Sequence, residues 1–357
     1  MFATYPIAAT GENWINSTLI SLLVGALEAL QRNAEPLQFY DGVPPEYRVE
    51  FSRGVEFPSL YDGFIDECRD LTLQQLDQIL VTINGQNDFP GVFAMNVPAP
   101  SIANDLPRVH EAALKLFRYA FKKLSHFKTP GNADTIRGHY QKLVHRHLRG
   151  GNCPFCEYEI LEAPDPDLVD PDLDHYLAIS KYPFAGVNLR NLTSMGITCN
   201  RSYKGAKDVL TDENNRKAIC IDPYGTDRIT FTLAGTVLLP GQGQGPSWNL
   251  TFEPDEASAN WRRVFNLEAR FKSTLLETRY QLWLEEFVSF ASEQKLDVSA
   301  RRGAIEAIQQ FVKTCRFDSL PTISKLKVGF FDLVKAGLRD PERGDRVHNF
   351  VMSVRDA

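Results

Sequence analysis

The chain of 357 residues carries 39 Lys and Arg against 45 Asp and Glu, for a formal net charge of −6, and 43% of its residues are hydrophobic. These values are typical of a soluble globular protein of two or three domains, and they exclude collagenous, disulfide-dense and intrinsically disordered chains. The longest apolar run, residues 19–30, contains Glu28 and is shorter than the ~20 residues of a membrane span, and no basic signal-peptide start is present, so we expect a cytoplasmic protein that does not span a membrane.

Residues 1–133 are predicted to form a mainly helical region. Asn16 or Ser17 is expected to cap a first helix that runs to about residue 30, and a second helix is expected at about residues 71–83. Through residue 105 this region holds 14 acidic side chains against four arginines and no lysine. We therefore expect an acidic surface that suits a basic partner or self-association.

The charge inverts between residues 106 and 150, where ten Lys and Arg side chains face only Glu111 and Asp134. Apolar spacing predicts two amphipathic helices here, at about residues 106–127 and 134–148, each with a basic face opposite its apolar face. A concentrated basic surface is typical of proteins that bind polyanions, and a solvated face without a ligand is the alternative. The candidate nucleic-acid-binding residues are Lys115, Arg118, Lys122, Lys142, Arg146 and Arg149.

Residues 134–235 form the second predicted region. After its helix at about residues 134–148, residues 151–235 show short apolar runs with frequent Pro, Gly and Asn. Cys153 and Cys156 have the Cys-x-x-Cys spacing of half a zinc site or of a redox pair, and the lack of a thioredoxin-like βαβ pattern around them favours zinc. Residues 236–357 form the third region. Its periodicity is again helical, with helices expected at about residues 298–317, 322–338 and 341–354.

The polar residues that follow Cys156 occur in a characteristic order. They are Asp174-His175-Tyr176, Tyr182-Pro183, Asn191-Leu192, Cys199-Asn200, Lys204 and Pro223-Tyr224. Together, residues 152–224 resemble the bacterial HNH nuclease family, in which an Asp-His pair, a central Asn and a helical His or Asn surround one divalent ion. With the helical flanks, the resemblance implies an α+β, predominantly helical protein whose small ββα-metal core lies between N- and C-terminal helical regions.

The resemblance assigns a role to each of these residues. His175 is expected to be the general base, because an imidazole with an unperturbed pKa of about 6.5 is suited to deprotonating water near neutral pH. Asp174 and Asn200 would supply hard oxygen ligands to a catalytic Mg²⁺ or Mn²⁺. Asn191 would hydrogen-bond across the loop and hold the His175 ring at the phosphate, and Lys204 would contact a phosphate group.

The zinc ligands are incomplete in the sequence. Related nucleases often carry a second Cys-x-x-Cys, and this chain has Cys199 at its second position but Gly196 at its first. The three thiolates of Cys153, Cys156 and Cys199 do not complete a tetrahedral structural site. The fourth ligand is Cys220 or is absent, and a small core of packed cysteines without a metal is the alternative.

These assignments predict a metal-dependent endonuclease. DNA is favoured over RNA as its substrate, although the chemistry of hydrolysis addresses the same phosphate in both. Little sequence specificity is expected, since the chain shows no recognition-helix signature and no aromatic stacking box. Similar standalone nucleases belong to bacterial anti-phage systems, which implies a regulatory ATPase or another defence protein as partner. Two alternatives stay open: a non-catalytic nucleic-acid-binding or assembly module with an HNH-like core, and an RNase with the same core.

Overall fold

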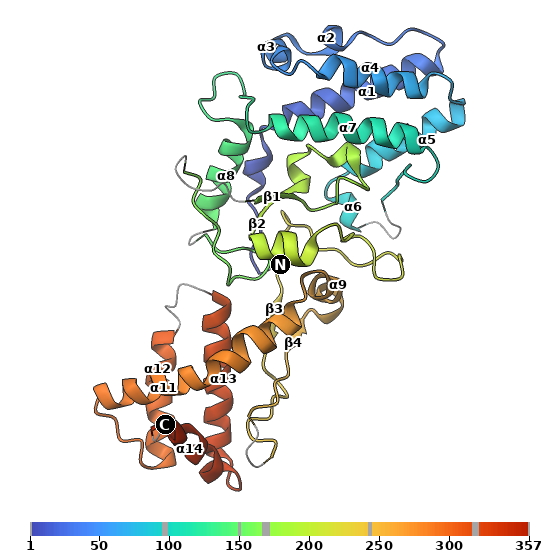
Figure 1. Cartoon of the computed structure of the whole chain (residues 1–357). Coiled ribbons are helices and arrows are strands. Elements are labelled where there is room, and N and C mark those ends of the chain that lie inside the picture. The colour runs from blue at the N-terminus through green and yellow to red at the C-terminus, as the bar shows by residue number, and fades with distance from the viewer. Residues whose placement is uncertain are drawn as a thin grey trace. The chain divides into compact units, whose positions relative to one another are not determined.

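The computed structural model describes residues 2–94, 99–148, 151–165, 172–241, 245–315 and 321–355. Helices dominate it, and the described strands form two sheets of two strands each (Figure 1). The predicted α+β, predominantly helical class is therefore confirmed. The chain divides into two compact units: Ala3–Pro154 with Leu161–Asp227, and Phe2 with Phe155–Ile160 and Arg228–Ala357.

The two units are divided differently from the three predicted regions: Phe155–Ile160 lie inside the predicted region 134–235 but belong to the second unit. The predicted junction after residue 235 lies close to the one that follows Asp227, but the residues on both sides of the predicted junction after residue 133 belong to the first unit. The reason is a set of hydrogen bonds between the N-terminal helices and the segment that follows the first strand. Gln86 and Asn87, for example, both bond to the backbone of Phe184.

The helices of the first unit follow the apolar periodicity of the sequence. They are α1 (Trp14–Gln31), α2 (Phe39–Gly42), α3 (Arg48–Ser52), α4 (Phe57–Cys68), α5 (Leu73–Asn87), α6 (Gly91–Ala94), α7 (Pro107–Lys123) and α8 (Ile136–His147). Thr72 and Gln75 form a capping box that starts α5. Helix α1 begins at Trp14 rather than at the predicted cap, because Asn16 is buried within the helix.

Helix α1 is the only helix of the described residues with the length and apolar composition of a membrane span. Of that window, 56% is buried inside the protein, and Leu19, Leu23 and Leu27 are fully buried. Such burial is typical of a core helix in a soluble globular protein, where the apolar side chains pack against neighbouring helices.

The sheet of the first unit pairs β1 (Asp172–His175) with β2 (Leu192–Met195) in antiparallel register, and a π-helical segment, Thr198–Lys204, follows β2. Three buried tyrosines from distant parts of the chain also hold β2. The Tyr5 hydroxyl donates to the Ser194 carbonyl at 2.6 Å, and the hydroxyls of Tyr140 and Tyr224 donate to the Leu192 carbonyl. These bonds fix the strand on which the candidate site is built.

The second unit is a sheet of two strands followed by helices. Its elements are β3 (Thr230–Thr232), β4 (Thr251–Glu253), α9 (Asp255–Phe265), α10 (Leu267–Ala269), a π-helical segment (Arg270–Leu276), α11 (Glu277–Glu293), α12 (Arg301–Cys315), α13 (Pro321–Arg339) and α14 (Gly344–Met352). The last three lie within a few residues of their predicted positions. Phenylalanines fill the core between them, with the rings of Phe311 and Phe331 5.1 Å apart.

Candidate active site

The predicted catalytic residues lie on consecutive elements of the first unit. Asp174 and His175 end β1, Asn191 immediately precedes β2, and Asn200 and Lys204 lie on the π-helical segment after β2. The order along the chain is therefore strand, strand and helix. The segments meet at Lys204, whose Nζ lies 2.8 Å from Oδ2 of Asp174 and donates to the His175 carbonyl at 2.7 Å.

Asn191 closes the loop that joins β1 to β2. Its Oδ1 accepts from the Leu177 N–H at 2.7 Å, and its Nδ2 donates to the carbonyls of Leu177 and Ala185, each at 3.1 Å. The side chain is fully buried, so these bonds do not compete with water. Asn191 thus ties both ends of the loop together.

His175 is held by the same loop through its ring. Its Nε2 lies 2.8 Å from the Gly186 carbonyl, and because a carbonyl oxygen only accepts, Nε2 carries the proton of the neutral ring and Nδ1 carries the lone pair. Burial lowers the pKa of His175 to about 4; the Gly186 carbonyl opposes this, and the charges of Lys204 and Arg118 add to it. The imidazole is therefore neutral at pH 7, which is the form that accepts a proton.

Lys204 is placed differently from its predicted role. Only 1% of its side chain is exposed, and its ammonium group is bonded to Asp174 and to the His175 backbone. The sequence predicted a contact between Lys204 and a phosphate, whereas the structure gives the ammonium group protein partners. Burial raises the pKa of the Asp174 carboxyl and the neighbouring ammonium of Lys204 lowers it, with burial the larger influence.

Asn200 bonds to a carboxylate on β1 two residues before Asp174. Its Nδ2 donates to Oδ2 of Asp172 at 3.3 Å, and Arg201 forms a two-bond ion pair with the same carboxylate. Asp172 and Asp174 lie on one face of β1 because side chains alternate along a strand. The side-chain oxygen of Asn200, Oδ1, accepts no hydrogen bond among the described residues, so it stays available as a ligand.

Side chains of the N-terminal region, outside the motif, also hold the loop, and no local sequence pattern indicates these contacts. Oδ1 of Asn13 accepts from the Leu189 N–H at 2.8 Å, Nδ2 of Asn188 donates to Asn87, and Nε2 of His110 contacts the Ser180 carbonyl at 2.9 Å. Each contact joins residues at least 70 positions apart. Only the tertiary structure could have revealed them.

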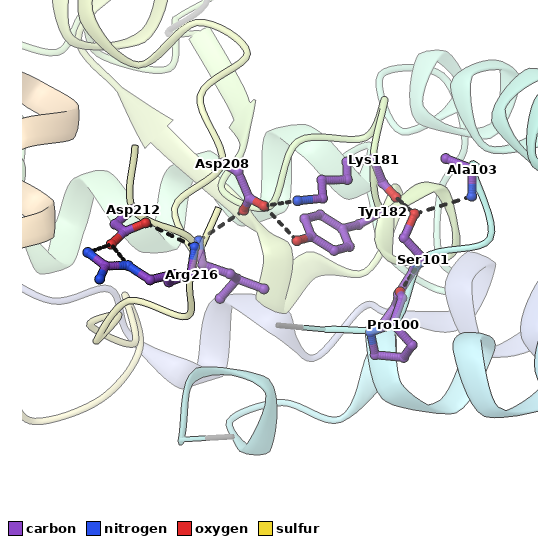
Figure 2. Close-up of polar contacts among 10 residues, drawn as sticks. Pro100, Ser101, Ala103, Lys181, Tyr182, Asp208, Asp212 and Arg216 are labelled. Atoms are coloured by element: carbon purple, nitrogen blue, oxygen red, sulfur yellow. Dashed lines mark hydrogen bonds and ion pairs between the residues drawn. The ribbon is translucent and has the colours of Figure 1, made fainter. Parts of the chain in front are cut away.

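A second anchor of the loop is the carboxylate of Asp208. Figure 2 shows the Lys181 ammonium and the Tyr182 hydroxyl converging on it, at 2.5 and 2.8 Å, while Ser101 donates to the Lys181 carbonyl. Burial alone would raise the pKa of Asp208, but the hydrogen bonds from Lys181, the Leu210 N–H and Tyr182 lower it below its ordinary value. The carboxylate is therefore ionised at neutral pH and links the loop to the segment after the π-helical turn.

Three cysteines form a buried group. The Sγ atoms of Cys153, Cys156 and Cys199 lie within 4.8 Å of one another, so the group could hold a metal ion. The Gly196 N–H, at the position where the second knuckle lacks a cysteine, points at Sγ of Cys153 at 3.4 Å. Cys220 does not join the group, and its thiol contacts the Tyr176 hydroxyl at 3.7 Å instead.

The candidate nucleic-acid-binding residues lie on α7 and α8. Lys115, Arg118 and Lys122 are exposed along α7, and Arg146 is exposed on α8. Lys142 is also exposed and pairs with Asp134 at 2.6 Å. The sixth predicted residue, Arg149, lies outside the described residues.

Helix α7 also reaches the candidate base, which the sequence did not indicate. The ring of Phe121 lies 4.3 Å from the His175 ring between centroids, tilted by 46°. Helix α7 packs on the short helical turn Pro183–Ala185 of the loop, and in Figure 1 it runs alongside the loop segment. The amphipathic pattern of α7 predicted which face is buried but not which loop it covers.

No protein-family model matches the chain, and no curated protein and no solved structure matches it significantly.

Proposed function

We propose that the chain is a metal-dependent endonuclease of the HNH type that hydrolyses phosphodiester bonds, with DNA as the favoured substrate. The observation that carries the proposal is the state of His175. Its Nε2 proton is fixed by the Gly186 carbonyl, which leaves a neutral ring with a lone pair on Nδ1, and the residue before it in β1 is Asp174. A neutral imidazole held in one tautomer can accept the proton of a water molecule, which supports the role of His175 as the base.

In the proposed hydrolysis, a side chain of this protein accepts the proton of the attacking water. A water oxygen forms a bond to phosphorus, and the bond between phosphorus and the leaving oxygen breaks. The proton of the water passes to Nδ1 of His175, and the leaving oxygen takes a proton from solvent. The Gly186 carbonyl holds the ring during the transfer, and Asn191 holds the loop that contains Gly186 by bonding to the carbonyls of Leu177 and Ala185.

The donor set fits a hard divalent cation. Asp174 supplies a carboxylate and Asn200 an amide oxygen that accepts no hydrogen bond among the described residues, and oxygen ligands of this kind suit Mg²⁺ or Mn²⁺. Such an ion supplies neutralisation of the charge that develops on the phosphate and the leaving oxygen. Binding at Asp174 requires Lys204 to share or release that carboxylate.

The basic side chains of α7 and α8 support a polyanionic substrate, since an array of exposed Lys and Arg can follow a phosphate backbone. A cytoplasmic location, membership in an anti-phage defence system and a regulatory ATPase as partner belong to the same proposal. The defence-system role and the ATPase partner follow from the family resemblance, whereas the cytoplasmic location follows from the sequence features given above. The acidic first 105 residues offer a surface for a basic partner.

One observation favours a second candidate function. The Asp174 carboxylate is already paired with a buried ammonium group, an arrangement that also suits a non-catalytic nucleic-acid-binding or assembly module with an HNH-like core. An RNase with the same core is chemically equivalent, because hydrolysis addresses the same phosphate. The following experiment separates these candidates.

Purified protein is incubated with plasmid DNA and with RNA of matched sequence, in Mg²⁺, Mn²⁺ or EDTA, beside the His175→Ala variant. We expect cutting of DNA that depends on the divalent ion and is lost in the variant. Preferential cutting of RNA would establish the RNase instead. A protein that binds DNA but cuts neither substrate under any condition would support the binding module.

We further propose that Cys153, Cys156 and Cys199 bind a structural zinc ion. Three buried thiols within 4.8 Å supply three of the four ligands of a tetrahedral site. Elemental analysis of the purified protein should give about one zinc per chain, and Cys199→Ser should lose it and unfold at a lower temperature. Cys220→Ser is the matched control, because Cys220 lies outside the group, and should keep the zinc. Wild-type protein without zinc would contradict the assignment.

A further inference from the structure

Helix α7 contacts the candidate base. Phe121 packs against the His175 ring with 4.3 Å between the ring centroids, and Arg118 lies three residues before Phe121 on α7. Residues three apart on a helix are neighbours on its surface, so both project from the same part of α7. The element that carries the basic surface is therefore also part of the wall of the site.

The cations next to the site differ in whether they are already paired. Lys204 is buried against Asp174, and Arg201 forms two hydrogen bonds with Asp172. Arg118 is exposed, and its guanidinium has no ion-pair partner within the part of the chain that the structure describes. Arg118 could therefore bind a phosphate near His175 without first breaking an ion pair with a carboxylate.

We propose that Arg118 binds the phosphate that is cut and that Phe121 is a positioning residue for the His175 ring. This inference rests on the proposed nuclease function and moves the phosphate contact from Lys204 to α7. A planar guanidinium can donate two parallel hydrogen bonds to phosphate oxygens, which an ammonium group cannot do. The Phe121 ring restricts rotation of the imidazole, whose only ring hydrogen bond among the described residues is the one to Gly186.

The role of Arg118 is tested by single-turnover cleavage of DNA at saturating enzyme. Arg118→Gln should lower the rate constant by at least about 10-fold, because a donor aimed at the reacting phosphate is lost. Arg118→Lys should recover part of the rate, since it restores the charge but not the paired donors. Arg32→Gln, which removes the same charge from the exposed end of α1, is the control and should cut at the wild-type rate.

The role of Phe121 is tested in the same assay. Phe121→Ala should lower the saturating rate constant more than it raises the KM, because ring orientation matters for the proton transfer and not for DNA binding. Phe121→Tyr keeps an aromatic ring against His175 and should restore most of the rate. Thermal unfolding of each variant shows whether the loss of rate follows from a loss of fold.

The outcomes separate this inference from the function on which it rests. A wild-type protein that cuts no nucleic acid overturns the proposed function itself. A wild type that cuts and loses activity in His175→Ala, but for which Arg118→Gln behaves like Arg32→Gln, overturns the assignment of Arg118 alone. Equal rates for Phe121→Ala and the wild type overturn the positioning role.

Discussion

Replacing His175 with glutamine should lower the rate of phosphodiester cleavage by about 10²–10⁴-fold while leaving the thermal unfolding temperature close to that of the wild type. The glutamine amide nitrogen can still donate to the Gly186 carbonyl, which now accepts from Nε2 of His175 at 2.8 Å. What the variant lacks is the lone pair of Nδ1. The substitution therefore removes the base and retains the hydrogen bond that orders the loop.

A matched control lies in the second unit. Nε2 of His348 contacts the Val298 carbonyl at 2.9 Å. His348→Gln therefore also replaces a histidine whose Nε2 bonds to a backbone carbonyl, and it does so far from the candidate site in sequence. Single-turnover cleavage and thermal unfolding are measured for both variants. Cleavage by His175→Gln at the rate of His348→Gln would show that His175 is not the base.

The second large effect concerns stability. Lys204→Met should lower the free energy of unfolding by about 3–5 kcal/mol in metal-free protein, because it leaves the carboxylate of Asp174 in a buried position without its partner. The Lys204 side chain is 1% exposed and that of Asp174 is 14% exposed, so little water can replace the lost ion pair. Denaturant titration of both proteins measures the difference.

A double variant tests whether the unpaired Asp174 carboxylate causes the loss of stability in Lys204→Met. In Lys204→Met/Asp174→Asn no charge remains unpaired, so most of the lost stability should return. Arg201→Met is the comparison on the neighbouring pair: Arg201 is largely exposed, and its loss from Asp172 should change stability much less. If Lys204→Met were as stable as the wild type, the ion pair with Asp174 would have no structural role.

The helices and the members of the site could be predicted from the sequence to different extents. Helix α7 and the three C-terminal helices lie close to their predicted positions because each has a continuous apolar face. Asn191 lies before β2 and bonds across the loop, and its predicted role of holding the His175 ring stays a prediction. The spacing of apolar residues was sufficient to predict the helices, and the order of the polar residues was sufficient to single out Asn191.

Other features depend on contacts that no local pattern encodes. The burial of Lys204 follows from the packing of the π-helical segment on β1, and the contact of Phe121 with His175 joins residues 54 positions apart in the chain. The three cysteines form one group as expected, but the exclusion of Cys220 depends on its contact with Tyr176. Side-chain chemistry was readable from the sequence, whereas the partners of each charge were not.

The hydrogen bonds from three tyrosines to the backbone of β2 have a consequence for folding. The bond from the Tyr5 hydroxyl to Ser194 spans 189 residues, and Tyr140 and Tyr224 reach the same strand from either side of it in the chain. Contacts of such high sequence separation form late, because a long loop must close before they are made. The strand that carries the candidate site thus reaches its final hydrogen bonding only after both flanks of the first unit have been synthesised. We therefore expect that residues 152–224 do not fold into the same structure when they are separated from Tyr5 and Tyr140.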